Sequence, residues 1–338
     1  MPIKNLDINE LIRRDVIRLI GLGGAGLLIA PGAALAQDKT PFRMDETNAV
    51  HFMSGHFIPR FITKPIDWQF KQFATSGQGR VSAFLRGAVD GIMTSWTYLV
   101  QIAFNDMPGT CISGMAGGGS RLLVPAGSTL KSFEELKGKR VGVVEGSFQD
   151  IQFIYACKRK GIDAYKDLTR VNLSSPTGVV AGMTSSRVDA CVIFEPYGSI
   201  LMVDHGARMI SDLGSDSFGI SNGGLYVHNE FIKKYPELTQ DIVDATVKAT
   251  DFVIKDNAAW VERVRQFTGQ SEAVAKLAVS NCTPALDIPL GTIRKISTAM
   301  YDAGIHNRDV ADTIDKFIDY RFLEKATGKT KEQLGFNA

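Results

Sequence analysis

The residues best suited to bind a ligand follow a short apolar run near the middle of the chain. Residues 141–144 are apolar and lie between Gly138 and Gly146, a length typical of a buried strand rather than of a helix. Ser147 comes next as a candidate N-cap, and an amphipathic helical pattern continues to Gly161. A strand, a small-residue loop and a helix start leave backbone N–H groups unpaired at the positive end of a helix dipole. Such a loop favours an anionic or polar ligand, and the alternative is an ordinary strand–helix connection without a ligand.

Composition indicates a globular protein that is large enough for two hydrophobic cores. The chain has 338 residues, of which 44% are hydrophobic and 22% are charged. The formal net charge of +2 is too small for a nucleic-acid surface, and no basic block occurs outside the N-terminal region. We therefore predict no nucleic-acid partner.

The N-terminal region has the pattern of an export signal. Arg13 and Arg14 precede an apolar, glycine-rich run at residues 19–30, and Ala34-Leu35-Ala36 is a small-residue cleavage site. The paired arginines resemble a twin-arginine signal, and a general secretory signal is the alternative. The apolar run is too short for a stable membrane span. We predict that residues 1–36 are cleaved and that the mature protein is periplasmic.

The histidines and cysteines lack the spacing of a catalytic or metal site. The 4 cysteines are spread along the chain without a C-x-x-C pair, which favours buried free thiols. A Cys157–Cys191 disulfide is the alternative, because an exported protein meets oxidising conditions. His51 and His56 would point to opposite faces of a strand. We therefore predict no metal site, no cofactor and no catalytic residue.

Alternating strand and helix patterns surround the central loop. A helix is expected from Val81 to Ala88, and Ser175 before Pro176 is expected to cap another. From Leu225 onward helical patterns replace the alternation. Strands are expected at residues 49–53, 68–73, 92–96, 111–115, 122–124, 141–144, 169–173 and 190–194. This order predicts an α/β protein with mostly parallel sheets.

Two segments repeat the same features in the same order. Residues 84–98 and 183–197 each contain a helix end, a Val-Asp pair and a strand, with a tyrosine eight positions after the aspartate. The repeat predicts two similar lobes, and chance similarity of two strand–helix units is the alternative.

The order of several short motifs resembles one family of exported binding proteins. The motifs are Leu136-Lys137-Gly138-Lys139-Arg140-Val141-Gly142-Val143, Gly146-Ser147, Arg187-Val188-Asp189-Ala190 and Glu195-Pro196-Tyr197. Behind an export signal they resemble the periplasmic substrate-binding proteins of the nitrate, sulfonate and taurine ABC importers, a group that includes binders of thiamine precursors. The resemblance covers nearly all of the mature chain and is strongest from Phe133 to Tyr197.

This resemblance implies a two-lobed, type II-like periplasmic binding protein with a helical C-terminal block. Residues 37–125 would form lobe I, residues 126–224 would form lobe II, and residues 225–338 would return to complete lobe I. One small molecule would bind in the cleft, and the lobes would close on it. The implied partners are that small molecule and an ABC permease in the inner membrane, with the binding protein itself a monomer.

By their position at strand ends, loops of both lobes would line the cleft. Lobe I would contribute Ser54, Gly55, His56, Gly77, Gln78, Thr94, Ser95, Trp96, Gly118 and Gly119. Lobe II would contribute Ser147, Phe148, Gln149, Ser174, Ser175, Thr177, Glu195 and Tyr197. Free N–H groups and hydroxyls at helix starts would hold an anionic or polar group. The aromatic side chains Trp96, Phe148, Tyr197 and His56 would form a wall.

For three of these residues the alternative is a purely structural role without ligand contact. Trp96 would otherwise be a core residue, and His56 would otherwise bond to loop backbone. Glu195 with Pro196 would otherwise only shape the turn after its strand. If the Glu195 carboxylate faces the ligand, a neutral, amine-bearing or zwitterionic solute is favoured over an anion.

We predict a solute-binding protein without catalysis, for a sulfonate, a carboxylate or an aromatic, pyrimidine-like molecule. The first alternative is an enzyme on the same fold, with thiamine-pyrimidine or sulfinate chemistry. The cysteine-dense motif expected for the thiamine-pyrimidine enzyme is absent from the sequence. The second alternative is a sensor that presents its closed form to a receptor.

Overall fold

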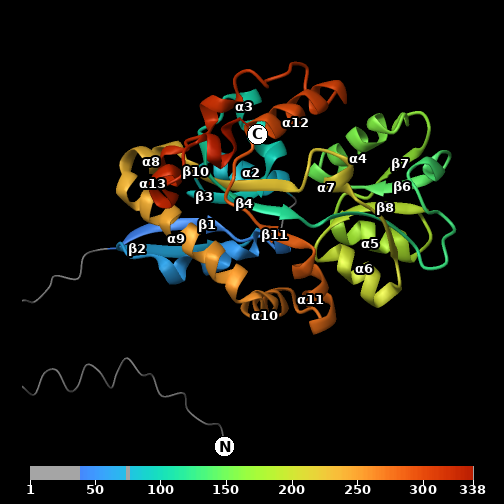
Figure 1. Ribbon diagram of the computed structural model, residues 1–338, viewed down its shortest axis with the longest axis horizontal. Helices are drawn as coiled ribbons and strands as arrows, with labels where there is room; N and C mark the ends of the chain where they lie inside the picture. Colours follow the sequence, from blue (N-terminus) through green and yellow to red (C-terminus); the bar gives the residue numbers. More distant parts are fainter. Residues whose placement is uncertain (1–38, 74–76, 338) are drawn as a thin grey trace, which may run out of the picture. The chain divides into compact units, whose positions relative to one another are not determined.

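The computed structural model describes residues 39–73 and 77–337, which fold around two mixed β-sheets (Figure 1). The predicted export signal at residues 1–36 lies outside the described residues. The expected α/β class is confirmed, because helices pack around both sheets.

The first sheet has the strand order β11-β4-β10-β3-β1-β2. β1 is parallel to β2 and β3, whereas β10 runs antiparallel to β3 and β4, and β11 runs antiparallel to β4. The strands are β1 (Thr40–Asp45), β2 (Ile66–Lys71), β3 (Gly91–Ser95), β4 (Gly109–Gly118), β10 (Ser221–His228) and β11 (Cys282–Pro284).

The second sheet has the strand order β7-β6-β8-β5-β9. β6 is parallel to β7 and β8, whereas β5 is antiparallel to β8 and β9. The strands are β5 (Ser120–Val124), β6 (Arg140–Val143), β7 (Thr169–Asn172), β8 (Ala190–Phe194) and β9 (Arg208–Asp212). In both sheets the antiparallel pairs involve strands that carry the chain from one sheet to the other.

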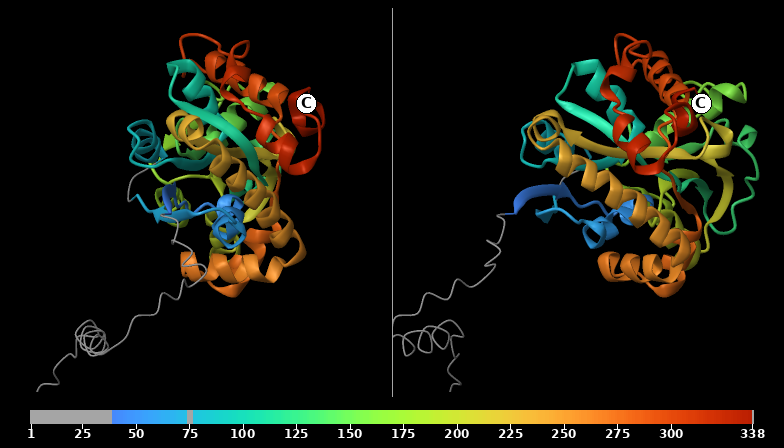
Figure 2. Two further views of the ribbon diagram at one scale, coloured as in Figure 1. Left: turned by 90° about the vertical axis from the view of Figure 1, so that its left-hand side faces the viewer. Right: turned by 60° about the vertical axis from the view of Figure 1, so that its left-hand side comes forward.

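Helices of the first half and the C-terminal block pack in one large core with the first sheet. Helix α9 packs on η2 and α13 and runs diagonally across the molecule in the side views (Figure 2). These helices are η2 (Val50–Phe61), α2 (Gly77–Leu85), α3 (Trp96–Asn105), α8 (Asn229–Lys234), α9 (Pro236–Lys255), α10 (Asn257–Thr268), α11 (Glu272–Ser280), α12 (Leu290–Asp302), η4 (Ile314–Phe317), α13 (Arg321–Thr327) and η5 (Glu332–Phe336).

The second sheet has apolar clusters on both sides, under its own helices. These helices are η3 (Glu134–Leu136), α4 (Phe148–Arg159), α5 (Pro176–Thr184) and α6 (Tyr197–His205), and α7 (Leu213–Asp216) leads back to the first sheet. Within the part of the chain that the structure describes, no helix is long and apolar enough to cross a membrane.

The chain passes between the sheets twice. β4 continues into β5 through Gly118 and Gly119, which have φ angles of 71° and 81°. A Cβ on Gly118 would lie 2.5 Å from the carbonyl oxygen of Asn281, so both the left-handed backbone and the close approach require glycine. The return crossing runs from Asp212 to Ser221 through α7.

Both crossings come earlier in the chain than the boundaries expected near residues 125 and 224. β5 pairs within the second sheet, and the first residues of β10 pair within the first sheet. Apolar strands of similar composition lie on either side of each boundary, so composition alone could not assign them to a sheet.

The strand expected at residues 49–53 is wrong, because the 3-10 helix η2 occupies Val50–Phe61. All residues from 50 to 58 are buried, so the run is apolar on every side and lacks the alternation that distinguishes a strand. The first strand is instead β1, where Phe42 and Met44 are buried on either side of the more exposed Arg43. His51 and Ser54 therefore lie on a helix rather than at a strand end.

β10 (Ser221–His228) corrects the expectation that helical patterns begin at Leu225. The strand lies between β3 and β4 in the middle of the first sheet. A Cβ on Gly223 would lie 2.1 Å from the Thr94 carbonyl oxygen, and a Cβ on Gly224 would lie 2.6 Å from the Ser113 carbonyl oxygen. The glycines thus allow a close approach to both neighbouring strands, and they also weaken the sequence signal of a strand.

The two predicted helix caps are confirmed. The Ser147 side chain accepts the N–H of Asp150 at the start of α4, and the Ser175 side chain accepts the N–H of Gly178 at the start of α5. Asp150 also accepts the Gly146 N–H at 2.9 Å, so the loop before α4 is held from both sides.

Replacing Ser147 with alanine should lower the free energy of unfolding by about 1 kcal/mol, because the Asp150 N–H loses its acceptor. Chemical denaturation of the purified variant measures this loss. Ser185→Ala is the matched control, because Ser185 lies beyond the C-terminal end of α5 and is exposed. Equal stability of the two variants would contradict the capping role of Ser147.

Candidate ligand-binding site

Three chain segments meet where the first crossing passes Gly119. The Glu195 N–H donates to the Gly119 carbonyl oxygen at 3.0 Å, and the Gly119 N–H donates to the Asn281 carbonyl oxygen at 2.8 Å. Val50, at the start of η2, donates its N–H to the Glu195 carbonyl oxygen at 3.1 Å. The end of β8 in the second sheet is therefore held against η2 and against the residue before β11, which both pack with β4 of the first sheet.

Glu195 is buried and is bound by the protein itself. Its Oε2 accepts the Ser199 N–H at 2.9 Å, and its Oε1 accepts the Asn281 side-chain amide at 2.7 Å. Burial raises the pKa of the carboxyl group, and the hydrogen bonds and the charge of Arg121 oppose that rise. Both oxygens already have protein partners, so Glu195 joins the end of β8, the first turn of α6 and the segment before β11.

Arg121 joins the two crossings. Its Nη1 donates to the Ser120 carbonyl oxygen at 2.9 Å and to the Asp212 carboxylate at 3.2 Å, and its Nη2 donates to the Asn281 carbonyl oxygen at 3.3 Å. Arg121 is only 5% exposed, and its Nε has no hydrogen-bond partner. Because Ser120 follows the first crossing and Asp212 precedes the second, one guanidinium group fixes both.

His51 presents an unpartnered ring nitrogen beside the first crossing. Burial lowers its pKa from 6.5 to about 3, so the imidazole is uncharged at neutral pH. Its Nδ1 is buried without a hydrogen-bond partner, 3.2 Å from the point where a Cβ on Gly119 would lie. The Cys282 Sγ lies at the same distance of 3.2 Å from that point. Since buried polar atoms are normally hydrogen-bonded, this nitrogen indicates a place where water or a ligand binds.

Three further buried polar atoms lack a partner in the same region: Ser54 Oγ, Ser199 Oγ and Asn222 Oδ1. Ser54 lies three residues after His51, which places both on one face of a 3-10 helix. Ser199 is in the first turn of α6. The Asn222 amide donates to the Gly118 carbonyl oxygen at 3.2 Å, so Asn222 lies beside the crossing. The unpartnered atoms thus come from both halves of the molecule.

Aromatic rings from both halves line the same place. The His51 and Phe194 ring centroids are 5.9 Å apart, and those of Phe194 and Tyr197 are 5.4 Å apart. The Asn48 side-chain amide donates to the Tyr197 hydroxyl at 2.8 Å. Asn48 precedes η2 and Tyr197 begins α6, so this hydrogen bond connects the two halves.

Helix α4 begins beside the crossing. Gln149 is buried and its side-chain amide donates to the Ser120 hydroxyl at 3.2 Å. Phe148 is also buried, and it packs in the core cluster of the first sheet although α4 follows β6 of the second. The first turn of α4 therefore connects the halves as well.

The structure brings together some of the residues predicted to bind the ligand. Gly118, Gly119, Gln149, Glu195 and Tyr197 take part in the contacts around the crossing. Ser54, Ser147 and Phe148 lie one helical turn or less from those contacts. Their contact with a ligand stays a prediction.

Trp96 and His56, which were expected in the aromatic wall, and Gly55 are packed against other groups of the protein. Trp96 is fully buried with its Nε1 bonded to the Ser221 hydroxyl at 3.0 Å, which is the core position given above as its alternative. His56 Nδ1 accepts from Arg263 Nε at 3.0 Å, and burial is the main cause of its pKa of about 3. A Cβ on Gly55 would lie 2.1 Å from the Met93 sulfur, so Gly55 is packed within the core.

The remaining predicted residues lie between the end of β7 and the start of α5, in β3 and at the start of α2. Ser174 donates its N–H to Asn172, and the Ser175 hydroxyl bonds to Gly178 and Thr177, beside the edge strand β7. The Ser95 hydroxyl bonds to Thr97 at 2.8 Å, and Thr94 is buried in β3. Gly77 begins α2 and Gln78 follows it.

Sequence reasoning missed several residues of the crossing cluster. His51 was hidden in the run that was misread as a strand. Arg121 had a usable signal, since a charged residue opens the apolar run 122–124 directly after a glycine-rich segment. The missed residues are Asn48, His51, Ser120, Arg121, Phe194, Ser199, Asn222, Asn281 and Cys282.

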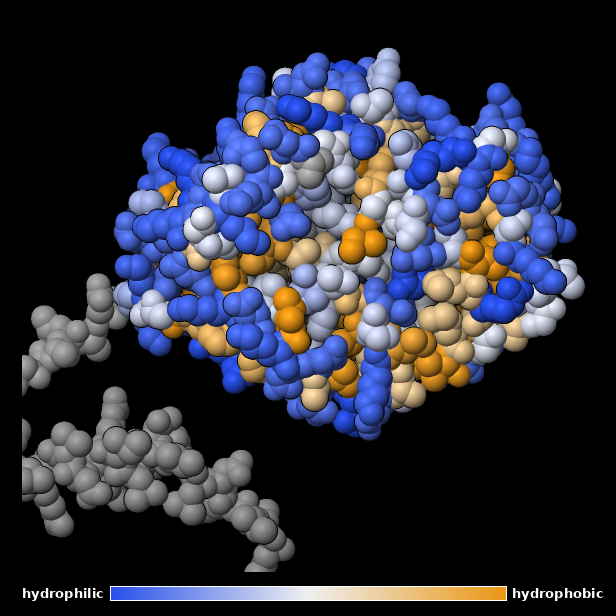
Figure 3. Space-filling view, viewed as in Figure 1, coloured by the Kyte–Doolittle hydropathy of each residue, from blue (hydrophilic) through white to orange (hydrophobic). Residues whose placement is uncertain are grey.

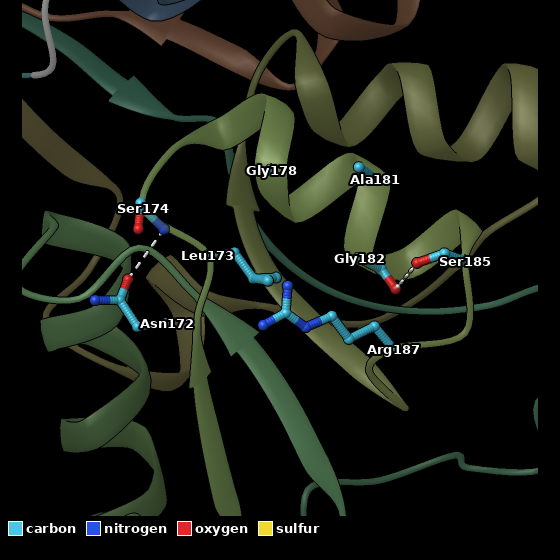
Figure 4. A pocket seen from close by; sticks show the side chains of 8 residues that line it. All are labelled: Asn172, Leu173, Ser174, Gly178, Ala181, Gly182, Ser185 and Arg187. Atoms are coloured by element: carbon cyan, nitrogen blue, oxygen red, sulfur yellow. Dashed lines mark hydrogen bonds between the residues drawn. The ribbon is translucent and has the colours of Figure 1, made fainter.

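Two cavities lie away from this cluster. One of about 340 Å³ lies along α5, and Figure 4 shows Arg187 reaching toward Leu173 within it. The other, of about 480 Å³, is lined by Tyr155 of α4, Tyr165 and Ala299 of α12 among others. On the face of Figure 3, hydrophilic residues cover the margins and apolar residues gather toward the middle and over α6. Neither cavity includes a residue that bonds at the crossing.

The cysteines and the possible metal ligands among the described residues show neither a disulfide nor a metal-binding group. All four cysteines are buried and free, so the alternative Cys157–Cys191 disulfide is not formed. Within residues 39–73 and 77–337, no group of three or more His, Cys, Asp or Glu side chains is arranged to hold a metal ion.

The family model described as NMT1/THI5 like matches residues 113–259, from β4 into α10. The match covers less than half of the chain. The matched segment contains the first crossing, all of the second sheet and the return into the first sheet. The resemblance to the nitrate, sulfonate and taurine binding proteins is thereby confirmed.

Solved structures share the fold of this chain. The periplasmic aliphatic sulphonate binding protein SsuA from Escherichia coli has a TM-score of 0.72 at 16% identity, covering 83% of this chain and 92% of that one. The desulfurization enzyme DszB has a TM-score of 0.65 at 16% identity, and the match covers 86% of this chain and 99% of that one. The periplasmic binding protein fold is therefore confirmed, and it occurs in binding proteins and in an enzyme alike.

Curated relatives match a shorter part of the chain. A binding protein of Brucella abortus strain 2308 is 26% identical over 125 residues. The match covers 36% of this chain and 38% of that relative, so it spans little more than a third of either protein.

Proposed function

We propose that this chain is the periplasmic solute-binding component of an ABC importer. It is exported, binds one small organic molecule where its two halves meet, and delivers that molecule to a permease in the inner membrane without changing it. The observation that carries the proposal is the set of buried polar atoms without partners around the crossing, on His51, Ser54, Ser199 and Asn222. A bound solute would supply the missing hydrogen bonds.

Closure of the two halves would complete the site. The crossings at Gly119 and at residues 213–220 are the covalent connections about which the halves would move. The Asn48–Tyr197 and Val50–Glu195 hydrogen bonds span the halves and would form on closure. Binding would then be favoured because the solute contacts residues from both halves only in the closed form.

A ligand panel tests this function. Purified mature protein is heated with nitrate, alkyl and aryl sulfonates, carboxylates and uncharged ring compounds, and unfolding is followed by fluorescence. At least one compound should raise the melting temperature in a concentration-dependent manner, because it binds the native state alone. Absence of any stabilising compound in an extended panel would count against the binding function.

An enzyme on the same fold is the second candidate, and one observation favours it. Cys282 and His51 both flank Gly119, and a thiol beside an imidazole is a pattern of nucleophilic catalysis. Burial and the charge of Glu195 raise the pKa of the Cys282 thiol well above its usual value, and Arg121 opposes the rise. A protonated thiol is a weak nucleophile, so binding without turnover is the better supported function. Consumption of a bound compound in the presence of wild-type protein, lost in Cys282→Ala, would support the enzyme instead.

A further inference from the structure

We propose that the solute is uncharged and is recognised through hydrogen bonds to His51 and to the hydroxyl and amide groups around it. This inference rests on the proposed function and narrows its substrate class. It separates this chain from its sulfonate-binding structural neighbours, and it follows from how the charged groups around the crossing are arranged.

The starts of α4 and α6, the two helices that begin beside the crossing, are already occupied by carboxylates of the chain. At α4, Asp150 accepts the Gly146 N–H at 2.9 Å while Ser147 caps the first turn. At α6, Glu195 accepts the Ser199 N–H at 2.9 Å. Each carboxylate complements the positive end of its helix, so an anionic ligand there would meet a like charge.

The arginines nearest the crossing and the start of α4 are also paired. Arg121 binds Asp212, and Arg170 binds Asp150 at 2.6 Å with side chains only 9% and 1% exposed. On the first-sheet side, Arg80 binds Asp45 and Arg263 binds Glu46. An anion would therefore have to displace a carboxylate from an arginine.

The groups that remain without partners are mostly uncharged. His51 offers a neutral imidazole nitrogen, Ser54 and Ser199 offer hydroxyls, and Asn222 offers a carbonyl oxygen. Arg121 Nε is the one charged donor among them, and its guanidinium already faces Asp212 and two carbonyl oxygens. An uncharged solute with donors and acceptors can satisfy these atoms without burying an uncompensated charge.

The rings of His51, Phe194 and Tyr197 indicate that the solute also has an apolar or ring portion. His51 is in η2, Phe194 ends β8 and Tyr197 begins α6, so the rings come from both halves. A flat or apolar portion packed against these rings would be desolvated when the halves close. The solute class is therefore an uncharged molecule that combines a hydrogen-bonding edge with an apolar or ring portion.

Matched pairs of compounds test the inference by calorimetric titration of the mature protein. Each pair has one scaffold with an uncharged or an anionic head, such as benzamide and benzoate or benzenesulfonamide and benzenesulfonate, extended to the scaffold that binds best in the panel. The uncharged member should bind about tenfold or more tightly, because the anion would be buried against carboxylates. Tighter binding of the anionic member would overturn the inference and leave the binding function intact. No binding to either member of any pair would contradict the binding function itself.

His51→Phe separates recognition from packing, because phenylalanine keeps a ring and removes the nitrogen. The variant should bind the preferred uncharged compound about tenfold more weakly than the wild-type protein does. The melting temperature of the ligand-free variant should stay within a few degrees of the wild-type value. His205→Phe is the control, since His205 is exposed at the end of α6. Unchanged affinity in His51→Phe would overturn the assigned role of His51.

Discussion

Replacing Arg170 with methionine should lower the free energy of unfolding by about 3–5 kcal/mol, because it leaves a buried carboxylate without its counter-charge. Arg170 contacts Asp150 at 2.6 Å, and Asp150 is 1% exposed in the first turn of α4. The same carboxylate holds the Gly146 N–H, so the loop that opens α4 should loosen as well. Urea denaturation at neutral pH measures the loss.

The pH dependence of the Arg170→Met variant follows from the sign of the Asp150 shift. Burial raises the pKa of Asp150 and Arg170 opposes the rise, so removing Arg170 raises that pKa further. A carboxyl group with a raised folded-state pKa favours the folded state at low pH and loses this contribution as the pH rises through the folded pKa. The deficit relative to wild type should therefore be largest at neutral pH and should shrink toward pH about 4.

A double variant controls this experiment. Arg170→Met with Asp150→Asn removes both charges, so most of the lost stability should return. A deficit that stays the same from neutral pH to acid, or that persists in the double variant, would show that Arg170 acts through packing on Tyr165 instead of through Asp150.

Replacing Gly223 with alanine should destabilise the protein by about 3 kcal/mol or more, because β10 cannot hold its place between β3 and β4 with a side chain at this position. The added Cβ would lie 2.1 Å from the Thr94 carbonyl oxygen and 2.7 Å from the Ser95 Cα. These are backbone atoms of a central strand and cannot move aside cheaply. Thermal and chemical unfolding measure the effect.

Gly127→Ala is the matched control for Gly223→Ala. Gly127 has a φ of +76° and no heavy atom within 4 Å of its added Cβ, so alanine there costs only the backbone strain. Gly223→Ala should be clearly the less stable of the two. A Gly223→Ala variant as stable as Gly127→Ala would contradict the register of β10 in the first sheet.

The parts of the fold that could be predicted from the sequence are those stabilised by contacts between residues close together in the chain. The strand at 141–144, the caps at Ser147 and Ser175 and the helix up to Gly161 all depend on contacts within a few positions of the chain. The same is true of β8 and the turn at Glu195. Local pattern was sufficient because the interactions that decide these elements are local.

The crossing cluster could be predicted only in part, because its contacts join segments that are distant in the sequence. Glu195 bonds to Asn281, 86 positions away, and Asn48 bonds to Tyr197, 149 positions away. Arg121 reaches both Asp212 and Asn281. No periodicity or local motif reports such pairs, which is why His51 and Arg121 were missed while Gly119, Gln149 and Tyr197 were found from strand ends.

The core position of Trp96 also depends on a contact between distant segments of the chain. Its place after a strand predicted a ligand wall, yet the missing side chain of Gly224 leaves room that the indole ring fills, 2.9 Å from where a Cβ would lie. The pairing of Trp96 with a glycine in a strand far along the sequence could not be read from either segment alone.

The central claim, reversible capture of one solute without chemistry, is tested most directly by equilibrium dialysis with the best compound of the panel, followed by mass spectrometry of the released solute. One molecule per chain should bind at saturation, and it should be recovered unchanged after the protein is denatured. Recovery of a modified product, or saturation at a stoichiometry other than one per chain, would contradict the account.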